Sequence, residues 1–285
     1  MVDMAENIWI NPIGGLGDAL MISGVLKLDI EREPSRKFNL VRRTKYLSIL
    51  KGHPAISYVG FPPKDAFIIG TDYWSKEVLG QGNRRAFQIL ARIFNLETPV
   101  EERLYFPDII STDFELNTII PFRNKNILIA PWSDSPRKEM DFNKWHEFVE
   151  KIKSDDTLII QAGRLGQQYI KGTYSIIGLT TPRSLINVIN KCDVVITSDN
   201  FIMHTAHYAG VPAIVLWGPT DSLIYGYCGQ VHIKGEERCE FFDKCIQPGY
   251  SHINYSIPCS LDKLKHCMNL IDTDRIVDAL KSFLT

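Results

Sequence analysis

The sequence predicts an α/β protein with two doubly wound, Rossmann-like domains. Short apolar segments of strand length alternate with segments of helical period, first up to residue 121 and again from residue 126. A polar connection at residues 122–125 separates the two series. Strands joined through helices pair in parallel, because each crossover returns the chain to the same sheet. We therefore expect one domain over residues 1–122 and a second over residues 123–285.

The first domain opens with a strand, a glycine-rich turn and a helix. The strand is expected at residues 7–11, the turn has the sequence GGLGD at residues 14–18, and the helix follows at residues 19–31. The turn does not match a dinucleotide-binding loop, because the tripeptide DAL follows its last glycine and supplies no third glycine. Asp18 can be a cap of the helix or a general base at a ligand site. Further strands are predicted at residues 38–41, 58–61 and 66–70, and helices at residues 46–51 and 84–96.

The second domain repeats the alternation. A strand–turn–helix–strand unit lies near its middle, with strands at residues 194–197 and 213–217. Both strands are apolar throughout, as expected of parallel neighbours in a sheet covered on two faces. A final helix at residues 273–284 could pack on either domain, including back onto the first. The remaining strands are predicted at residues 127–130, 157–161 and 175–177, and the remaining helices at residues 143–153 and 182–191.

Polar segments follow the strands of the second domain. Because the carboxyl ends of parallel strands meet at one sheet edge, four segments are expected there: the loop at residues 131–138, the turn at Gly163, and the turns at residues 198–200 and 218–221. The first of these loops contains hydroxyls, backbone amides and two basic side chains, which are groups that bind anions. The alternative is a basic loop exposed to solvent, which has the same composition. This edge is the predicted ligand site.

Two residues of this edge also have structural interpretations. His204 can be a helix residue hydrogen-bonded to a neighbour, and Asp221 can cap the turn that follows it. The position of Asp221 at the end of the sequence Gly-Pro-Thr-Asp favours a ligand-edge role. Trp217 is expected in the core.

Charge and hydropathy exclude two classes of protein. Thirty-two Lys and Arg against 33 Asp and Glu leave a net charge of −1, which provides no long-range attraction for nucleic acid. The apolar runs are too short to cross a bilayer, and the N-terminal residues are acidic where a signal peptide needs a basic region. We therefore expect a cytoplasmic protein without a transmembrane segment, for which peripheral membrane contact remains open.

Four late cysteines have the spacing C-x5-C-x13-C-x7-C. Four thiolates in so short a segment could hold structural zinc or iron, but neither half has the two-residue gap that is typical of zinc sites. Reduced, partly buried thiols are the alternative. The candidate metal ligands are Cys239, Cys245, Cys259 and Cys267.

Four segments together resemble the bacterial lipopolysaccharide heptosyltransferases, which form glycosyltransferase family nine. They are the turn at residues 14–18, Lys138 placed seven residues before Trp145, the segment at residues 199–204 and the sequence GPTD at residues 218–221. The resemblance implies the GT-B fold, in which two Rossmann-like domains face a cleft, the first binding the acceptor and the second the donor. It also implies inverting sugar transfer that requires no metal or other cofactor.

The resemblance assigns roles to individual residues. Asp18 matches the base for the acceptor hydroxyl, and Lys138 matches the lysine that contacts the donor diphosphate as it departs. Asp199 matches the aspartate that contacts the donor sugar, with His204 beside it. The acceptor-side residues implied are Gly14, Gly15 and Gly17, and the donor-binding residues implied are Ser133, Arg137, Lys138, Gly163, Asp199, Asn200, His204, Gly218, Pro219, Thr220 and Asp221.

The implied donor is a nucleoside diphosphate sugar similar to ADP-heptose. The implied acceptor is a saccharide or glycolipid of lipopolysaccharide or of another surface glycan. Two positions depart from the family pattern, since Phe201 stands where a glycine is usual and Asp134 where a second hydroxyl is usual. Two other functions fit the same fold: a nucleotide-sugar epimerase and a catalytically degenerate protein that binds a nucleotide sugar.

Overall fold

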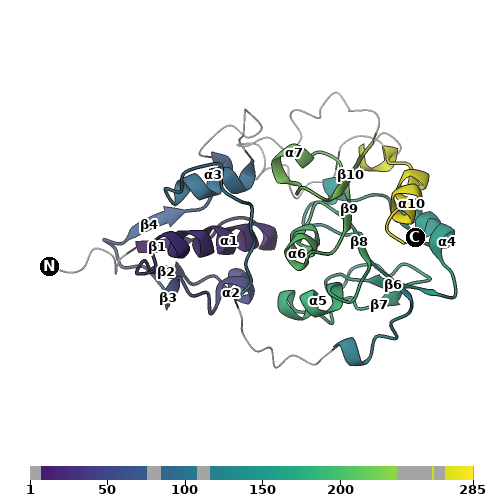
Figure 1. The fold of residues 1–285 in the computed structure, drawn as a ribbon, viewed down its shortest axis with the longest axis horizontal. Coiled ribbons are helices and arrows are strands. Elements are labelled where there is room, and N and C mark those ends of the chain that lie inside the picture. Colours follow the sequence, from purple (N-terminus) through teal and green to yellow (C-terminus); the bar gives the residue numbers. More distant parts are fainter. Residues whose placement is uncertain (1–7, 76–84, 108–115, 236–258, 260–266, 285) are drawn as a thin grey trace. The chain divides into compact units, whose positions relative to one another are not determined.

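The structure of the protein is a computed structural model that describes residues 8–75, 85–107, 116–235, 259 and 267–284. The chain folds into two compact units, Met1–Thr112 and Asp113–Thr285, and each unit is built on a parallel β-sheet of its own (Figure 1). None of the described helices is both long and apolar enough to cross a membrane.

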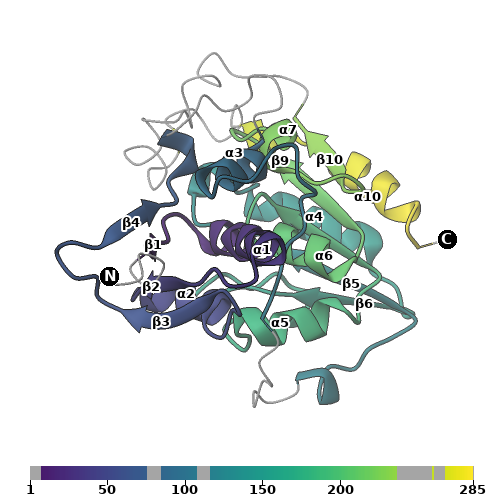
Figure 2. The same cartoon turned by 60° about the vertical axis from the view of Figure 1, so that its left-hand side comes forward.

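The first unit has a four-stranded sheet with helices packed against it. Its strands are β1 (Ile8–Asn11), β2 (Phe38–Val41), β3 (Ile56–Gly60) and β4 (Phe67–Gly70), and its helices are α1 (Leu16–Arg32), α2 (Thr44–Leu50), α3 (Ala86–Ile93) and the short 3-10 turn η2 (Tyr73–Ser75). The strand order is β3-β2-β1-β4 with every pair parallel (Figure 2). Ile10 of β1 is fully buried and lies level with Leu40 on β2 and Ile69 on β4. α1 contacts both α2 and α3 and buries most of its residues.

α1 begins earlier than the sequence indicates, at Leu16 rather than at residue 19. Its N-terminal cap is Gly15, and the carboxylate of Asp18 in the first turn accepts the Gly15 N–H at 2.5 Å. This contact satisfies an amide that a helix start leaves without an intrahelical partner. The last three residues of the GGLGD sequence therefore belong to the helix, and only its two leading glycines form the turn.

The second unit has a six-stranded, wholly parallel sheet. Its strands are β5 (Lys125–Ala130), β6 (Thr157–Gln161), β7 (Tyr174–Ser175), β8 (Val194–Ser198), β9 (Ala213–Trp217) and β10 (Val231–Lys234), in the order β10-β9-β8-β5-β6-β7. The chain first adds β6 and β7 on one side of β5 and then adds β8, β9 and β10 on the other. The strand order therefore reverses between β5 and β8, which makes that point a topological switch.

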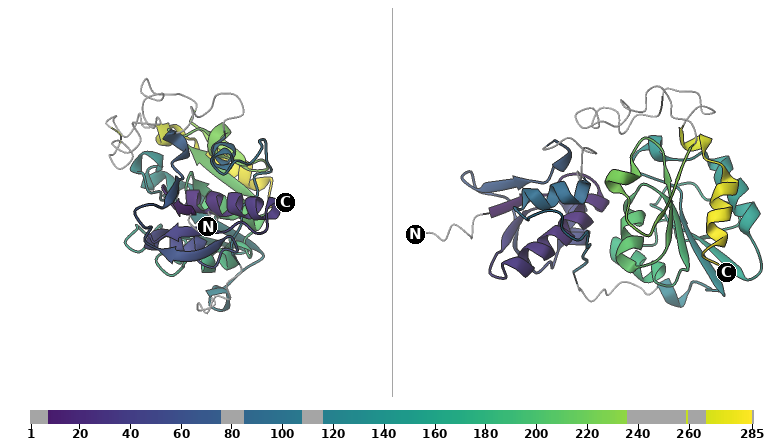
Figure 3. Two further views of the ribbon diagram at one scale, coloured as in Figure 1. Left: turned by 90° about the vertical axis from the view of Figure 1, so that its left-hand side faces the viewer. Right: turned by 45° about the horizontal axis from the view of Figure 1, so that its top comes forward.

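Helices cover both faces of the larger sheet. They are α4 (Phe142–Ile152), α5 (Pro182–Ile189), α6 (Phe201–Ala209), α7 (Ser222–Tyr225) and α10 (Thr273–Lys281), with the 3-10 turns η3 (Leu116–Thr118), η4 (Pro136–Lys138) and η6 (Cys267–Leu270). α5 and α6 lie on one face, and α4 and α10 lie on the other (Figure 1 and Figure 3). β8 and β9 are buried parallel neighbours, as the sequence predicts. β10 and α7 are not predicted from the sequence.

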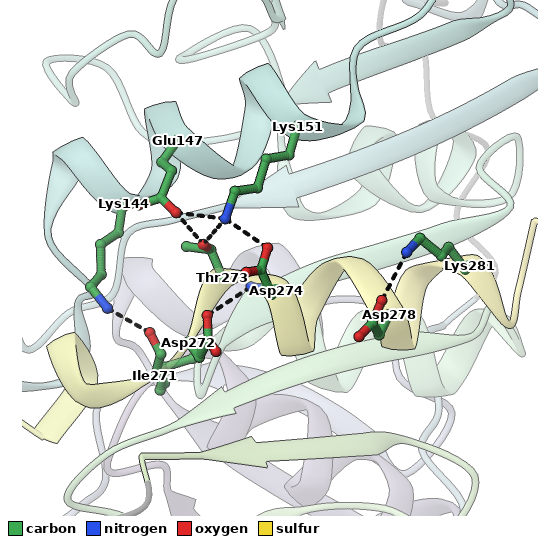
Figure 4. A network of polar contacts seen from close by, with 9 residues as sticks. All are labelled: Lys144, Glu147, Lys151, Ile271, Asp272, Thr273, Asp274, Asp278 and Lys281. Carbon is green, nitrogen blue, oxygen red and sulfur yellow. Dashed lines mark hydrogen bonds and ion pairs between the residues drawn. The ribbon is translucent and has the colours of Figure 1, made fainter.

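The last helix packs on α4 and on strands of its own unit. Its apolar residues Ile276 and Leu280 enter the core of the second unit. The polar contacts are centred on Lys151 of α4, whose Nζ donates to Asp274 Oδ1 at 2.7 Å and to Thr273 Oγ1 at 2.8 Å (Figure 4). Lys144 Nζ donates to the carbonyl of Ile271 at 2.7 Å. α10 is therefore held to α4 by an apolar face and by a row of charged groups beside it.

Candidate functional site

The carboxyl ends of β5, β6, β8 and β9 lie at one edge of the six-stranded sheet, because all of these strands are parallel. The structure thus confirms that the four polar segments following them share an edge. The switch between β5 and β8 is the position at which open α/β sheets bind their ligands. The loop after β5 and the turn after β8 therefore form the centre of the candidate site.

A buried ion pair joins the loop after β5 to the turn after β8. Lys138 lies in η4, and Asp199 directly follows β8, 61 residues further along the chain. The Lys138 Nζ is 3.2 Å from the Asp199 Oδ2, and the two residues are only 6% and 7% exposed. Buried charges are costly unless they are paired, so each of the two fixes the other in place. The structure thus brings together two residues that the family resemblance assigns to one donor.

Three buried hydroxyl groups lie at the same edge. Ser135 lies in the loop after β5, Ser198 ends β8, and Thr220 follows β9. Their oxygens have no hydrogen-bond partner among the described residues. A buried hydroxyl without a partner costs about 1–3 kcal/mol, a cost that a polar ligand at this edge would remove. The sequence analysis names Thr220 as a donor-binding residue, and it includes Ser135 and Ser198 only as members of the loop at residues 131–138 and the turn at residues 198–200.

Asn200 fixes the turn after β8. Its side chain accepts the N–H of Ile202 at 2.8 Å, which caps α6, and its Nδ2 donates to the carbonyl of Trp132 at 2.9 Å. The same residue therefore starts the helix and ties this turn to the loop after β5. Phe201 takes the first position of α6 and has helical backbone, which does not require the glycine that is usual in the family.

Side-chain hydrogen bonds stabilise the loop after β5. The N–H of Ser133 donates to Glu139 Oε1 at 2.9 Å, and the Ser133 Oγ accepts the N–H of Ser135 at 3.2 Å. Burial raises the pKa of Glu139, and the hydrogen bond from Ser133 acts in the opposite direction. Asp134, the departure from the family pattern, pairs with Arg164 at 2.8 Å at an exposed position. Its negative charge is therefore compensated by a residue of the loop after β6.

His204 is a buried, neutral residue of α6. Its Nδ1 lies 2.6 Å from the Tyr227 hydroxyl in a hydrogen bond, and the ring of His207 stacks on Tyr227 at a centroid distance of 3.9 Å. Burial lowers the pKa of His204 to about 4, and the positive charge of Lys138 acts in the same direction. This geometry fits the interpretation of His204 as a helix residue bonded to a neighbour.

The turn after β9 is held in place by the packing of Gly218 and by the polar contacts of Asp221. A side chain at Gly218 would collide with Met268 of η6, since an added Cβ would lie 2.6 Å from the Met268 sulfur. Asp221 caps α7 by accepting the N–H of Leu223 at 3.0 Å, and it pairs with Lys234 of β10 at 3.0 Å. The structure therefore confirms the capping interpretation of Asp221.

Three further predicted donor residues lie in the loops of this edge. Pro219 is buried, and Arg137 in η4 is half-buried. The carbonyl of Gly163 accepts the N–H of Gly178 at 2.8 Å.

Asp18 lies in the first unit, where both of its carboxylate oxygens accept hydrogen bonds. Besides the Gly15 N–H on Oδ2, the hydroxyl of Tyr73 donates to Oδ1 at 2.7 Å. Gly14 has a φ of +105°, and a Cβ there would lie 2.3 Å from Asp18 Oδ2. A glycine is therefore needed at position 14 both for the backbone conformation and for the close approach of the carboxylate. Gly17 lies inside α1 and is buried.

The four late cysteines are only partly covered by the structure. Cys239 and Cys245 lie outside the described residues, whereas Cys259 and Cys267 are described and half-buried. Within the described ranges, no cluster of three or more His, Cys, Asp or Glu side chains could hold a metal ion. Cys267 lies next to Gly218, at the turn after β9.

Solved glycosyltransferases share the fold of the whole chain. The family 9 glycosyltransferase of Veillonella parvula matches with a TM-score of 0.68 and 14% identity, over 98% of this chain and 97% of its own. The iron-containing dodecameric glycosyltransferase TibC of enterotoxigenic E. coli matches with a TM-score of 0.70 and 14% identity, over 98% and 77%. The E. coli ADP-heptose lipopolysaccharide heptosyltransferase II matches with a TM-score of 0.65 and 12% identity, over 98% of both chains. The fold is therefore GT-B.

The family can be assigned from the sequence itself. A search of curated protein sequences finds no match. The model of glycosyltransferase family 9 (heptosyltransferase) matches residues 84–232, slightly more than half of the chain. This span includes the buried pair of Lys138 and Asp199 and the three hydroxyls that lie at the same sheet edge. The match and the geometry agree, and the chain belongs to glycosyltransferase family 9.

Proposed function

We propose that the protein is an inverting glycosyltransferase that moves a heptose from a nucleoside diphosphate to a saccharide acceptor. The observation that carries this proposal is the buried Lys138, held by Asp199 at the switch point on an edge that also bears three hydroxyls without partners in the described structure. A lysine and hydroxyl donors match the charge and the acceptor oxygens of a diphosphate. ADP-heptose as donor is supported by the E. coli proteins of this fold, since TibC has been solved with ADP-D-β-D-heptose and WaaC with ADP-2-deoxy-2-fluoro heptose.

The proposed transfer is a single displacement. The oxygen of the acceptor hydroxyl attacks the anomeric carbon of the donor from the face opposite to the diphosphate. The new carbon–oxygen bond forms while the bond from the anomeric carbon to the diphosphate oxygen breaks, so the configuration inverts. Asp18 takes the proton of the hydroxyl, and the diphosphate leaves with the bonding electron pair. Lys138 stabilises the negative charge that develops on it.

The proposed roles do not require a metal ion in the transfer step. Lys138 supplies a positive charge and the hydroxyls supply hydrogen bonds, which is the stabilisation that a diphosphate leaving group needs. We expect transfer to continue in the presence of EDTA. Elemental analysis of protein purified without added metal tests separately for structural zinc or iron at the late cysteines, and the iron of TibC is the reason to include iron.

The acceptor that we propose is a saccharide or glycolipid of lipopolysaccharide or of another surface glycan. This proposal is supported by membership of the heptosyltransferase family. We infer that the enzyme acts in the cytoplasm and meets a glycolipid acceptor by peripheral contact with the membrane.

A two-stage experiment tests the proposal. A thermal-shift panel of ADP, GDP, UDP and dTDP identifies the nucleotide, and ADP is expected to give the largest increase in Tm. The purified protein is then incubated with the matching nucleotide sugar and candidate acceptors, and products are followed by mass spectrometry and NMR of the anomeric proton. The expected product is a glycoside of inverted configuration. Turnover of the donor without an acceptor would show an epimerase instead, and binding without turnover would show a degenerate enzyme.

A further inference from the structure

We propose that Tyr73 is the positioning residue for Asp18, holding its carboxylate in one orientation. The inference rests on the proposed function of Asp18 as the acceptor base. It is carried by the 2.7 Å hydrogen bond from the Tyr73 hydroxyl to Asp18 Oδ1, which joins residues 55 positions apart in the sequence.

A hydrogen-bonded segment after β4 brings Tyr73 to this position. β4 runs parallel to β1 up to the pairing of Gly70 with Asn11. The next residue, Thr71, is fully buried, and its hydroxyl accepts the N–H of Ile13 at 2.9 Å and donates to the carbonyl of Asn11 at 3.3 Å. The N–H of Tyr73 donates to the carbonyl of Thr71 at 2.8 Å, and η2 packs on α3. The end of β4 and the glycine turn are thus connected before Tyr73 reaches Asp18.

The hydrogen bonds from Tyr73 and Gly15 reach opposite oxygens of the Asp18 carboxylate. The Tyr73 hydroxyl binds Oδ1 and the Gly15 N–H binds Oδ2, so rotation of the carboxyl group would break both. Hydrogen bonds to a charged carboxylate favour the charged form. Tyr73 is therefore expected to extend the pH range in which the base can work toward lower pH.

A phenol suits this task because it donates a hydrogen bond without adding a charge. The Tyr73 ring is 3% exposed, so the packing of the ring fixes the position of its hydroxyl. A basic side chain in its place would form an ion pair and weaken the base more strongly. Among the described residues, α2 also faces the turn: the Tyr46 hydroxyl and the Lys45 Nζ donate to the carbonyl of Gly14 at 2.8 and 3.1 Å, and the charge of Arg43 acts on Tyr46.

Tyr46 provides a matched control for Tyr73. It is also a buried tyrosine beside the glycine turn, and burial and then the charge of Asp18 raise its pKa, so its hydroxyl stays protonated at neutral pH. Its hydrogen bond goes to the backbone of the turn, however, and the bond from Tyr73 goes to the carboxylate. Replacing either residue by phenylalanine removes one oxygen and keeps the ring.

The experiment compares Tyr73→Phe with Tyr46→Phe in the pH profiles of kcat and kcat/KM for sugar transfer. For Tyr73→Phe we expect a lower kcat, an unchanged KM for the nucleotide sugar and an acid limb that moves about one unit to higher pH, because a hydrogen bond to a charged group is lost. For Tyr46→Phe we expect the acid limb to stay in place. Site-specific 3-fluorotyrosine at position 73, a stronger hydrogen-bond donor, is expected to move the limb to lower pH.

Asp18→Asn separates failure of this inference from failure of the proposed function. If Asp18→Asn transfers sugar at the wild-type rate, the base role itself is wrong. If Asp18→Asn is inactive while Tyr73→Phe keeps the wild-type kcat and acid limb, only the positioning role is wrong. The same conclusion follows if the fluorinated protein keeps the wild-type limb. Thermal unfolding of each variant checks that the fold is retained.

Discussion

Lys138 and Asp199 form a pair whose stability depends on both charges being present. The Lys138 Nζ lies 3.2 Å from the Asp199 Oδ2, and both residues are buried. Removing one partner of a buried pair leaves the other charge without compensation and costs about 3–5 kcal/mol, whereas replacing both by neutral groups is far less costly. We infer that the main effect of the pair is to hold Lys138 in position.

The first prediction uses this asymmetry. Lys138→Met should lower the free energy of unfolding by about 3–5 kcal/mol in urea, and the double variant Lys138→Met, Asp199→Asn should regain most of that loss. Both should lose about 10²- to 10³-fold in kcat for transfer, because the leaving diphosphate is no longer stabilised. A double variant that transfers sugar at the wild-type rate would show that Lys138 has no such role.

Two buried histidines, one in each unit, make stability depend on pH. Burial lowers the pKa of His53 and of His204 to about 4. His53 bridges two backbone groups, since its Nε2 is 3.0 Å from the Ser23 carbonyl and its Nδ1 accepts the Ala55 N–H at 3.0 Å. In the unfolded chain both rings titrate near pH 6.5, so between that pH and about 4 the unfolded chain binds more protons than the folded one. The contribution of the two neutral histidines to the free energy of unfolding is therefore complete above pH 6.5 and is lost as the pH falls toward 4.

The second prediction follows from the burial of these rings. The free energy of unfolding should decrease as the pH is lowered from 6.5 to 4, with a contribution of about 3 kcal/mol from each histidine. His53→Gln keeps a side-chain donor for the Ser23 carbonyl and removes one titrating group, so its stability should fall less steeply over the same range. Urea denaturation at several pH values measures both slopes, and equal slopes would contradict a buried neutral His53.

At the scale of elements, the attachment of α10 to α4 shows which of two kinds of contact is stronger. The charged row around Lys151 lies at the surface, where ion pairs are screened by water and contribute little. Ile276 on the apolar face of the helix is fully buried in the core of the second unit. Its removal would leave a cavity, which is a larger loss.

The third prediction compares these contacts directly. Ile276→Ala should lower the free energy of unfolding by about 2–5 kcal/mol. Lys151→Met should have a much smaller effect that decreases further in high salt, because surface pairs are screened. Chemical denaturation at low and high ionic strength measures both. Equal losses for the two variants would show that the charged row stabilises the helix as much as the apolar face does.

At the scale of the whole molecule, the proposed roles divide between the two units. Asp18 belongs to Met1–Thr112, whereas Lys138, Asp199 and the three hydroxyls belong to Asp113–Thr285. Binding of a nucleoside diphosphate and transfer of the sugar should therefore respond differently to substitutions in the two units.

The fourth prediction tests this division. Asp18→Asn should abolish transfer and leave the Kd for ADP unchanged, because the base does not contact the nucleotide. Lys138→Met should reduce transfer and also weaken ADP binding, by about tenfold or more for the loss of one charged hydrogen bond. Isothermal titration calorimetry beside a transfer assay measures both properties. Loss of ADP binding in Asp18→Asn would contradict the division.

Most elements follow from the sequence because their signals are local. The alternation of apolar strands with helices predicts two parallel sheets, and the apolar segments at β8 and β9 predict their buried pairing. The beginning of α1 was predicted three residues too late, because glycines usually mark a turn and the contact from Asp18 to Gly15 is not visible in composition. β10 and α7 are not predicted from the sequence.

The sequence by itself determined the fold class, the family resemblance and the sheet edge at which the polar segments lie, because strand period, helix period and motif spacing are properties of neighbouring residues. Only the tertiary structure decided which side chains meet: Lys138 with Asp199, and Tyr73 with Asp18. It also showed that Ser135 and Ser198 are buried without described partners. These contacts join residues far apart in the chain, and their geometry is set by strand order and packing, which no local pattern encodes.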